Sequence, residues 1–190
     1  RTKDGKTTAI DFREMAPNQA SRDMFLDDQS NPDSKKSLTS HLASGTPGTV
    51  AGFSLALEKY GTLPLNKVVQ PAIRLARDGF VVNDALADDL KTYGSEVIPN
   101  HENSKAIFWK DGEPLKKGDK LVQKNLAKSL ELIAENGPDA FYKGPIADQI
   151  ADEMQKNGGL ITKADLAEYK AVEREPISGT YRGYEVFSMP

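Results

Sequence analysis

The stretch Thr7-Thr-Ala-Ile-Asp-Phe-Arg-Glu-Met-Ala-Pro17 has the period of two that is typical of a β-strand. Ile10 and Phe12 fall on one face of this strand, and Asp11 and Arg13 fall on the other. If the two apolar side chains pack inward, Arg13 emerges on the opposite face at the end of the strand, just before Pro17 breaks the pattern. Upstream, the turn signal Asp4-Gly5 predicts that the strand belongs to a β-hairpin at the start of the chain.

Downstream of this strand the chain is polar at first and then mostly helical. Residues 18–47 lack a regular period, which predicts a long excursion with short helical pieces. Apolar spacings of three and four predict five helices, over about residues 50–60, 66–78, 83–93, 122–136 and 146–154, with Pro71 moving the start of the second toward residue 70. Thr162-Lys-Ala-Asp165 reads as a capping box that opens a short last helix.

Two further strands are predicted at Ile177–Tyr181 and Tyr184–Phe187, around a turn at Arg182-Gly183. Strands therefore lie at both ends of the chain, with a helix-rich middle. This order predicts an α+β layered fold, and a length of 190 residues suits one domain spanning residues 1–190. Both ends read as interior sequence, so we expect a segment truncated at each end.

Composition excludes several classes of function. The formal net charge of -3 provides no basic field for nucleic acid. No apolar run approaches the roughly 20 residues that cross a bilayer, so no membrane span is expected. The chain has no cysteine, which removes thiolate nucleophiles and Cys-based metal sites.

The usual catalytic and cofactor motifs are missing, and we expect no metal or cofactor. His41 and His101 lie sixty residues apart without metal-ligand spacing, and read as exposed loop residues. The Gly-rich run Ser44-Gly-Thr-Pro-Gly-Thr49 precedes a helix and could hold an anion, but it lacks a phosphate-binding Lys. A structural turn with an N-cap is the favoured interpretation.

Adjacent acidic residues and the single tryptophan favour structural roles. Neighbouring residues on a helix or strand point apart, so the acidic pairs predict solvated faces and not an acid–base dyad; these pairs are Asp27-Asp28, Asp88-Asp89 and Asp152-Glu153. Trp109 fits a hairpin-like turn packed on the helices.

Arg13 is the strongest candidate for a binding residue. A guanidinium at the end of a strand suits bidentate capture of a carboxylate. The alternative is a surface ion pair with Asp11 or Glu14, which spacing alone favours because such pairs are common and weak.

Five blocks of sequence, in order along the chain, resemble the large subunit of gamma-glutamyltransferases, most closely the periplasmic enzymes of enteric bacteria. They are Asp11-Phe-Arg-Glu-Met-Ala-Pro17, Ser44-Gly-Thr-Pro-Gly-Thr-Val-Ala-Gly52, Pro71-Ala-Ile-Arg-Leu-Ala-Arg-Asp-Gly-Phe80, Gly158-Gly-Leu-Ile-Thr-Lys-Ala-Asp-Leu166 and Tyr181-Arg-Gly-Tyr-Glu-Val186. The resemblance implies the N-terminal-nucleophile hydrolase architecture, an αββα sandwich. It also implies a periplasmic precursor that cleaves itself into a large and a small subunit.

The resemblance further implies a reaction. In this family the N-terminal Thr of the small subunit attacks the gamma-glutamyl amide of glutathione, and water, an amino acid or a dipeptide takes the acyl group. Arg13 matches the arginine that binds the alpha-carboxylate of the glutamyl donor. The nucleophile has no counterpart, since residue 1 is Arg1, so we expect no catalytic residue in this chain. The alternative class is a noncatalytic helical interaction module.

Overall fold

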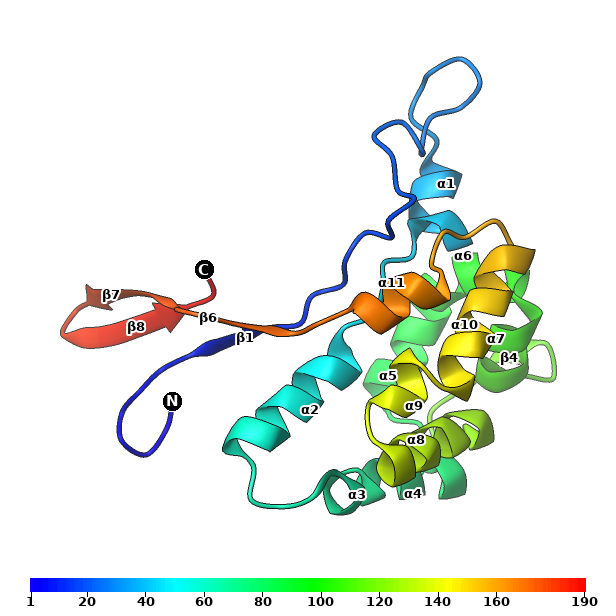
Figure 1. Cartoon of the computed structure of the whole chain (residues 1–190). Helices are drawn as coiled ribbons and strands as arrows, with labels where there is room; N and C mark the ends of the chain where they lie inside the picture. Colours follow the sequence, from blue (N-terminus) through cyan, green and yellow to red (C-terminus); the bar gives the residue numbers. More distant parts are fainter. The chain divides into compact units, whose positions relative to one another are not determined.

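The computed structural model describes all 190 residues, and the chain divides into two compact units. Unit 1 comprises residues 1–65 and 136–190, and unit 2 comprises residues 66–135. Helices and strands occur together in both units, which confirms the α+β class (Figure 1). That residues 1–190 form a single domain stays a prediction.

Unit 1 contains four strands in two pairs and several short helices. Its elements are β1 (Ala9–Asp11), α1 (Ser34–Leu38), the 3-10 helix η1 (His41–Ala43), α2 (Thr49–Tyr60), α9 (Asp139–Tyr142), α10 (Pro145–Lys156), α11 (Lys163–Glu168), β6 (Val172–Arg174), β7 (Ile177–Tyr181) and β8 (Tyr184–Ser188). The polar excursion with short helical pieces is therefore confirmed.

The prediction of a hairpin at the start of the chain is wrong. The Asp4-Gly5 turn does form, with Gly5 at φ 90° and a 2.8 Å hydrogen bond from the Thr2 N–H to the Lys6 carbonyl. Only three residues precede Asp4-Gly5, too few for a partner strand. β1 instead pairs antiparallel with β6, where Ala9 lies opposite Arg174 (Figure 1). A local turn signal cannot specify such a distant partner.

The core of unit 1 lies between the helices α9, α10 and α11. Leu166, Ala147 and Ile161 are almost fully buried there, beside Tyr142 and Tyr169. The predicted capping box is confirmed: Thr162 Oγ1 accepts from the Asp165 N–H at 3.2 Å, and Asp165 Oδ2 accepts from the Thr162 N–H at 2.8 Å. The box fixes the direction in which α11 leads into Tyr169.

Helix α2 packs against the end of β1. The rings of Phe12 and Phe53 meet edge to face, with centroids 5.8 Å apart. Gly52 of α2 also approaches Phe12, and a Cβ atom at Gly52 would overlap the Phe12 ring. Phe12 thus packs inward, as the alternating pattern predicts, and glycine allows the helix to approach the strand closely.

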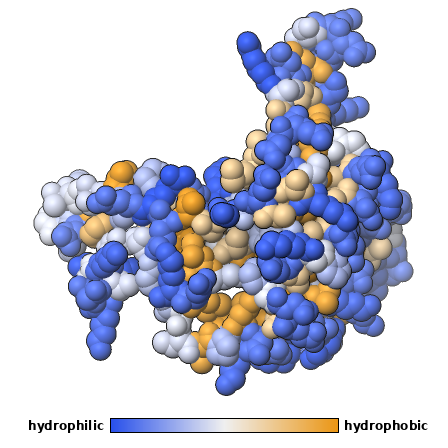
Figure 2. Space-filling model, viewed as in Figure 1, coloured by the Kyte–Doolittle hydropathy of each residue, from blue (hydrophilic) through white to orange (hydrophobic).

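The β7–β8 hairpin confirms the two predicted end strands. Ile177 pairs with Ser188 and Tyr181 with Tyr184, and every residue of both strands is exposed. Among the exposed side chains are Tyr184 and Phe187. Orange apolar areas interrupt a mostly hydrophilic surface in Figure 2.

Unit 2 is built from short helices and two small strand pairs. Its elements are α3 (Leu65–Val68, whose first residue belongs to unit 1), α4 (Gln70–Asp78), β2 (Phe80–Val81), α5 (Asp84–Asp89), the π-helix η2 (Leu90–Gly94), α6 (Ser95–Val97), the 3-10 helix η3 (Ile98–Asn100), α7 (Glu102–Phe108), β3 (Trp109–Lys110), β4 (Glu113–Pro114), β5 (Lys120–Leu121) and α8 (Lys124–Asn136, whose last residue belongs to unit 1). Its core contains Val82, Leu90, Leu115 and Leu121.

Three sequence predictions in unit 2 are confirmed. Pro71 lies in the first turn of α4, so this helix begins near residue 70. The helix predicted to start at about residue 83 begins as α5 at Asp84, with Asn83 as an N-cap that accepts from the Leu86 N–H at 2.9 Å. Trp109 starts the tight β3–β4 turn and packs against the core of unit 2. Helix α7 was not predicted, because its polar sequence has no clear apolar stripe.

None of the helices in either unit has the length and apolar character needed to span a membrane.

Candidate functional site

Arg13 lies two residues beyond the end of β1, with its side chain in solvent. The side chain is 82% exposed, and its Nε atom lies 3.4 Å from Glu14 Oε1. This is one of the two ion pairs considered from the sequence. The guanidinium makes no hydrogen bond within the chain, so its donors are available to a ligand.

Two hollows in unit 1 share Arg13 as a lining residue. The larger has a volume of about 620 Å³ and is lined by Ile10, Asp11, Phe12, Arg13, Glu14, Thr49, Arg174, Met189 and Pro190. The second, of about 540 Å³, is lined by Asp11, Arg13, Glu14, Met15, Glu168, Tyr169, Lys170, Val172 and Arg174. Arg13 therefore stands on a charged rim between two open spaces.

The second arginine on this rim, Arg174, is already paired. Its Nε atom donates to Asp11 Oδ2 at 2.7 Å, across the β1–β6 ladder. The hydrogen bond from Arg174, with a second from the Arg13 N–H, holds the pKa of the Asp11 carboxyl below its ordinary value. Arg174 is thus hydrogen-bonded to Asp11, whereas the contact of Arg13 with Glu14 is longer and is not a hydrogen bond.

Side chains also fix the backbone of Arg13. Asp11 Oδ1 accepts a hydrogen bond from the Arg13 N–H at 3.1 Å. On the other side, the Tyr169 hydroxyl donates to the Arg13 carbonyl at 2.7 Å. Burial, together with the nearby charges of Asp11 and Glu14, raises the pKa of the Tyr169 hydroxyl. A tyrosine hydroxyl is a protonated donor at neutral pH even without this shift.

The Gly-rich turn lies beside the Arg13 segment. Met15 and Thr46 exchange backbone hydrogen bonds of 3.2 and 2.7 Å. Gly48, within this run, is the N-cap of α2, as predicted, although no side chain of the run caps the helix. The Tyr142 hydroxyl accepts from the Ala51 N–H at 3.1 Å and satisfies one donor of the first turn. These contacts give the turn a structural role.

The two histidines do not form a site. His41 lies in η1, in unit 1, with its side chain 28% exposed and its Nε2 atom 3.6 Å from Glu153 Oε1. His101 precedes α7 in unit 2 and is also half-buried. The expectation of exposed loop residues is therefore wrong, because His41 lies within η1, His101 is the N-cap residue of α7, and both are half-buried. No cluster of three potential metal ligands occurs.

The adjacent acidic residues all lie on the surface, as predicted. The three pairs Asp27-Asp28, Asp88-Asp89 and Asp152-Glu153 are exposed. Asp27 accepts backbone hydrogen bonds from Gln29 and Asn31, at 2.9 and 2.8 Å, and thereby closes its own loop. None of these pairs forms an acid–base dyad.

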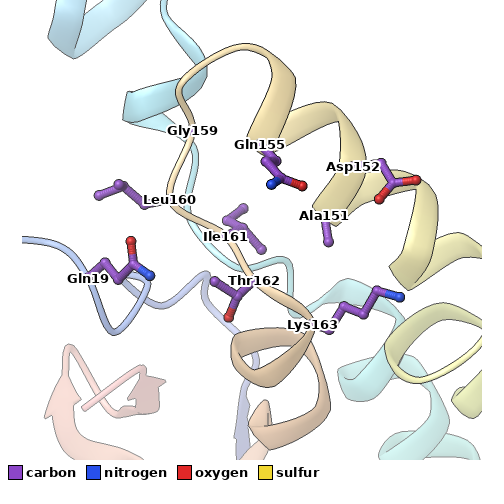
Figure 3. Close-up of a pocket in the computed structure, with 9 residues that line it drawn as sticks. All are labelled: Gln19, Ala151, Asp152, Gln155, Gly159, Leu160, Ile161, Thr162 and Lys163. Carbon is purple, nitrogen blue, oxygen red and sulfur yellow. The ribbon is translucent and has the colours of Figure 1, made fainter.

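A further hollow, of about 370 Å³, lies between α10 and the start of α11 (Figure 3). Figure 3 shows the Lys163 side chain extending toward α10, where its ammonium lies 2.6 Å from Asp148. The hydrogen bond to Asp148 raises the pKa of Lys163, which keeps the ion pair charged. Because its cation is already neutralised, this hollow is a weaker binding site for an anion than the one at Arg13.

Comparison with solved structures identifies the class of fold. The structure of gamma-glutamyltranspeptidase from Helicobacter pylori matches all of this chain with a TM-score of 0.95 at 44% identity, over 54% of that chain. The enzyme from Pseudomonas nitroreducens matches 98% of this chain with a TM-score of 0.89 at 36% identity, over 54% of its own. By fold, the chain is part of an N-terminal-nucleophile hydrolase, as the resemblance implies.

Sequence comparison then identifies the family. The gamma-glutamyltranspeptidase family model matches residues 1–190, and the chain belongs to this family. The glutathione hydrolase proenzyme of Escherichia coli strain K12 is 86% identical over all 190 residues. The match covers 33% of that relative, so the chain spans about a third of the length of the curated relatives that it matches.

Sequence reasoning singled out Arg13 as a candidate but missed the residues around it. Asp11 was considered only as a partner of the Arg13 side chain, whereas it binds the Arg13 backbone and Arg174. Its position two residues before Arg13, on the same strand face, was a usable signal. Tyr169 gave none, because its contact with Arg13 spans 156 residues.

Proposed function

We propose that this chain is the part of a gamma-glutamyltransferase that binds the alpha-carboxylate of the gamma-glutamyl donor through Arg13. The observation that carries the proposal is an exposed guanidinium without hydrogen bonds, on the rim of a hollow of about 620 Å³, in a chain of this family. A planar guanidinium can donate two parallel hydrogen bonds to a carboxylate. The Glu14 contact at Nε leaves the two terminal nitrogens for that purpose.

The proposed reaction belongs to the whole protein. A precursor cleaves itself into a large subunit, which contains this chain, and a small subunit. The N-terminal Thr of the small subunit attacks the gamma-glutamyl amide of glutathione, and the amine leaves as a gamma-glutamyl-Thr ester forms. Water, an amino acid or a dipeptide then takes the acyl group. This chain supplies the carboxylate-binding arginine and scaffold, and by itself is inactive.

The partners and location follow from the same proposal. The substrates are glutathione and other gamma-glutamyl compounds, the protein partner is the small subunit of the same precursor, and the compartment is the periplasm. The names of two curated relatives, both glutathione hydrolase proenzymes, support the choice of substrate and the precursor.

The experiment replaces Arg13 with lysine in the full-length protein. Arg13→Lys keeps the charge but removes the planar fork, so we expect the KM for gamma-glutamyl p-nitroanilide to rise about tenfold or more, because hydrogen bonds to charged groups are worth about 1.5–3 kcal/mol. Arg22→Lys is the matched control. Arg22 is 95% exposed and pairs with the adjacent Asp23 at 3.7 Å, but it lies outside both hollows.

Two outcomes would contradict the proposal. An unchanged KM in the Arg13→Lys protein would remove the role of Arg13. A full-length protein that turns over no gamma-glutamyl compound would favour the alternative, a noncatalytic interaction module.

A further inference from the structure

The backbone of Arg13 is held by one side chain close in sequence, Asp11, and by one that is distant, Tyr169. β1 ends at Asp11, opposite Val172, so Arg13 lies outside the ladder. Its N–H donates to Asp11 Oδ1 at 3.1 Å and its carbonyl accepts from the Tyr169 hydroxyl at 2.7 Å. Without these side chains, the segment that carries the guanidinium would be an unpaired strand end.

Tyr169 is itself fixed by its surroundings. It follows the last residue of α11, and it is 9% exposed. Its ring stacks on that of Tyr142, with centroids 5.8 Å apart and planes 7° from parallel. The Tyr142 hydroxyl donates to the Pro47 carbonyl at 2.9 Å and accepts from the Ala51 N–H at 3.1 Å. The side chain of Tyr169 is therefore more constrained than the exposed strand end to which its hydroxyl donates.

The atoms around Gly48 are packed too closely to admit a side chain at this residue. A Cβ atom at this residue would overlap both the Tyr169 hydroxyl and the Phe12 carbonyl oxygen. Its φ of -109° is accessible to any residue, so the need for glycine here is one of space. The N-terminus of α2, Tyr169 and the Arg13 segment are thus packed in contact.

We propose that Tyr169 is a positioning residue for donor binding, whose hydroxyl holds the Arg13 backbone so that the guanidinium faces the alpha-carboxylate of a gamma-glutamyl donor. The inference rests on the proposed function, because it assumes that Arg13 binds this carboxylate. Tyr169 acts through Arg13, since its hydroxyl is already bonded to the Arg13 carbonyl. Its loss therefore weakens donor binding and leaves the chemical step intact.

Tyr169→Phe in the full-length enzyme tests the inference, because it removes the hydroxyl and keeps the ring. We expect the KM for gamma-glutamyl p-nitroanilide to rise about threefold to tenfold, the net value of one hydrogen bond, with kcat within about twofold. Tyr93→Phe is the control. It also removes one tyrosine hydroxyl, from an exposed residue of η2 in unit 2, and is expected to leave KM unchanged.

A double variant separates positioning from general support of the fold. In the Arg13→Lys background, Tyr169→Phe is expected to add no further increase in KM, because the two residues act as one unit. Two analogues of similar size at residue 169 provide a second test if the Phe variant does not fold. 4-Aminophenylalanine keeps a donor and is expected to preserve KM, whereas 4-methylphenylalanine is expected to raise it.

The outcomes distinguish the inference from the function on which it rests. If Arg13→Lys raises KM but Tyr169→Phe leaves it unchanged, or if the two effects are independent, the positioning role is overturned and the proposed function stands. The same holds if both analogues give the same KM. If Arg13→Lys also leaves KM unchanged, the proposed function fails and the inference fails with it.

Discussion

The two strand pairs of unit 1 are both antiparallel, but they are stabilised differently. β1 and β6 come from distant parts of the chain, and a 2.7 Å bond joins Asp11 to Arg174, 163 residues away. Glu173 of β6 also contacts Lys59 and Tyr60 at the end of α2. By contrast, β7 and β8 are joined by the two-residue turn Arg182-Gly183, with φ values of 49° and 85°.

The β1–β6 pair is contacted by other parts of this chain, whereas the β7–β8 hairpin is exposed on all of its residues. The β1–β6 pair ends two residues before Arg13, and it is joined by contacts between its two strands and with α2. The β7–β8 hairpin exposes all of its residues, among them Val186 at 48% and Phe187 at 40%. The backbone of Arg13 is therefore held by hydrogen bonds within this chain, whereas the hairpin has unpaired edges and uncovered apolar side chains.

The largest expected effect compares one glycine beside each pair. Gly48→Ala is expected to lower the free energy of unfolding of the chain by about 2 kcal/mol or more, because the new Cβ atom would overlap Phe12 and Tyr169. Gly179→Ala in β7 places its Cβ in open space and is expected to raise stability by about 0.5 kcal/mol. Urea unfolding followed by circular dichroism measures both. Equal changes in the free energy of unfolding for the two variants would contradict the close packing of Gly48 against Phe12 and Tyr169.

The second prediction concerns association through the hairpin. We expect the isolated chain to self-associate as its concentration rises, and Val186→Lys to move association to higher concentration, since a charge on an edge pair blocks further pairing. Val68→Lys is the control: Val68 is 43% exposed, close to the 48% of Val186, but lies in unit 2. Sedimentation velocity measures the effect. A chain that stays monomeric at all concentrations and melts sharply and reversibly would contradict it.

The smallest expected effect is the pH dependence of the β1–β6 pair. The hydrogen bond from Arg174 lowers the pKa of Asp11 in the folded state. The stabilisation is therefore complete above the unfolded pKa of about 3.9, and it is lost as pH falls through the lower folded pKa. Asp11→Asn is expected to reduce the drop in melting temperature on acidification below about pH 4.

Glu185→Gln on β8 is the control for the pH experiment. The Glu185 side chain is 66% exposed and lies 3.8 Å from Arg1, so this ion pair contributes little to the stability of the chain. A drop in melting temperature that is the same in the Asp11→Asn protein as in the unaltered chain would argue against a stabilising role for the pair.

Local features of the fold could be predicted from the sequence because local residues determine them. The capping box at Thr162 and Asp165, the start of α4 at Pro71 and the β7–β8 hairpin depend on residues a few positions apart. In each of these elements, nearby residues satisfy the backbone hydrogen bonds or restrict the φ angles. Short-range physics is sufficient for such elements.

The pairing of β1 could not be predicted in this way. The Asp4-Gly5 signal correctly predicted a turn, but the predicted partner strand of β1 was wrong. β1 pairs with β6 and packs against α2, and these contacts are distant in sequence. The position of Arg13 at a strand end was readable from alternation. The hydroxyl that holds its carbonyl was not, since Tyr169 is 156 residues away.

The most direct test of the central claim compares two donors that differ only at the alpha-carbon. We would measure kcat/KM in the full-length enzyme for gamma-glutamyl p-nitroanilide and for its alpha-carboxamide analogue, with Arg13 intact and with Arg13→Gln. If Arg13 binds the alpha-carboxylate, the intact enzyme prefers the carboxylate donor by about tenfold or more, and the variant loses most of that preference. An equal preference in both proteins would show that another residue recognises the carboxylate.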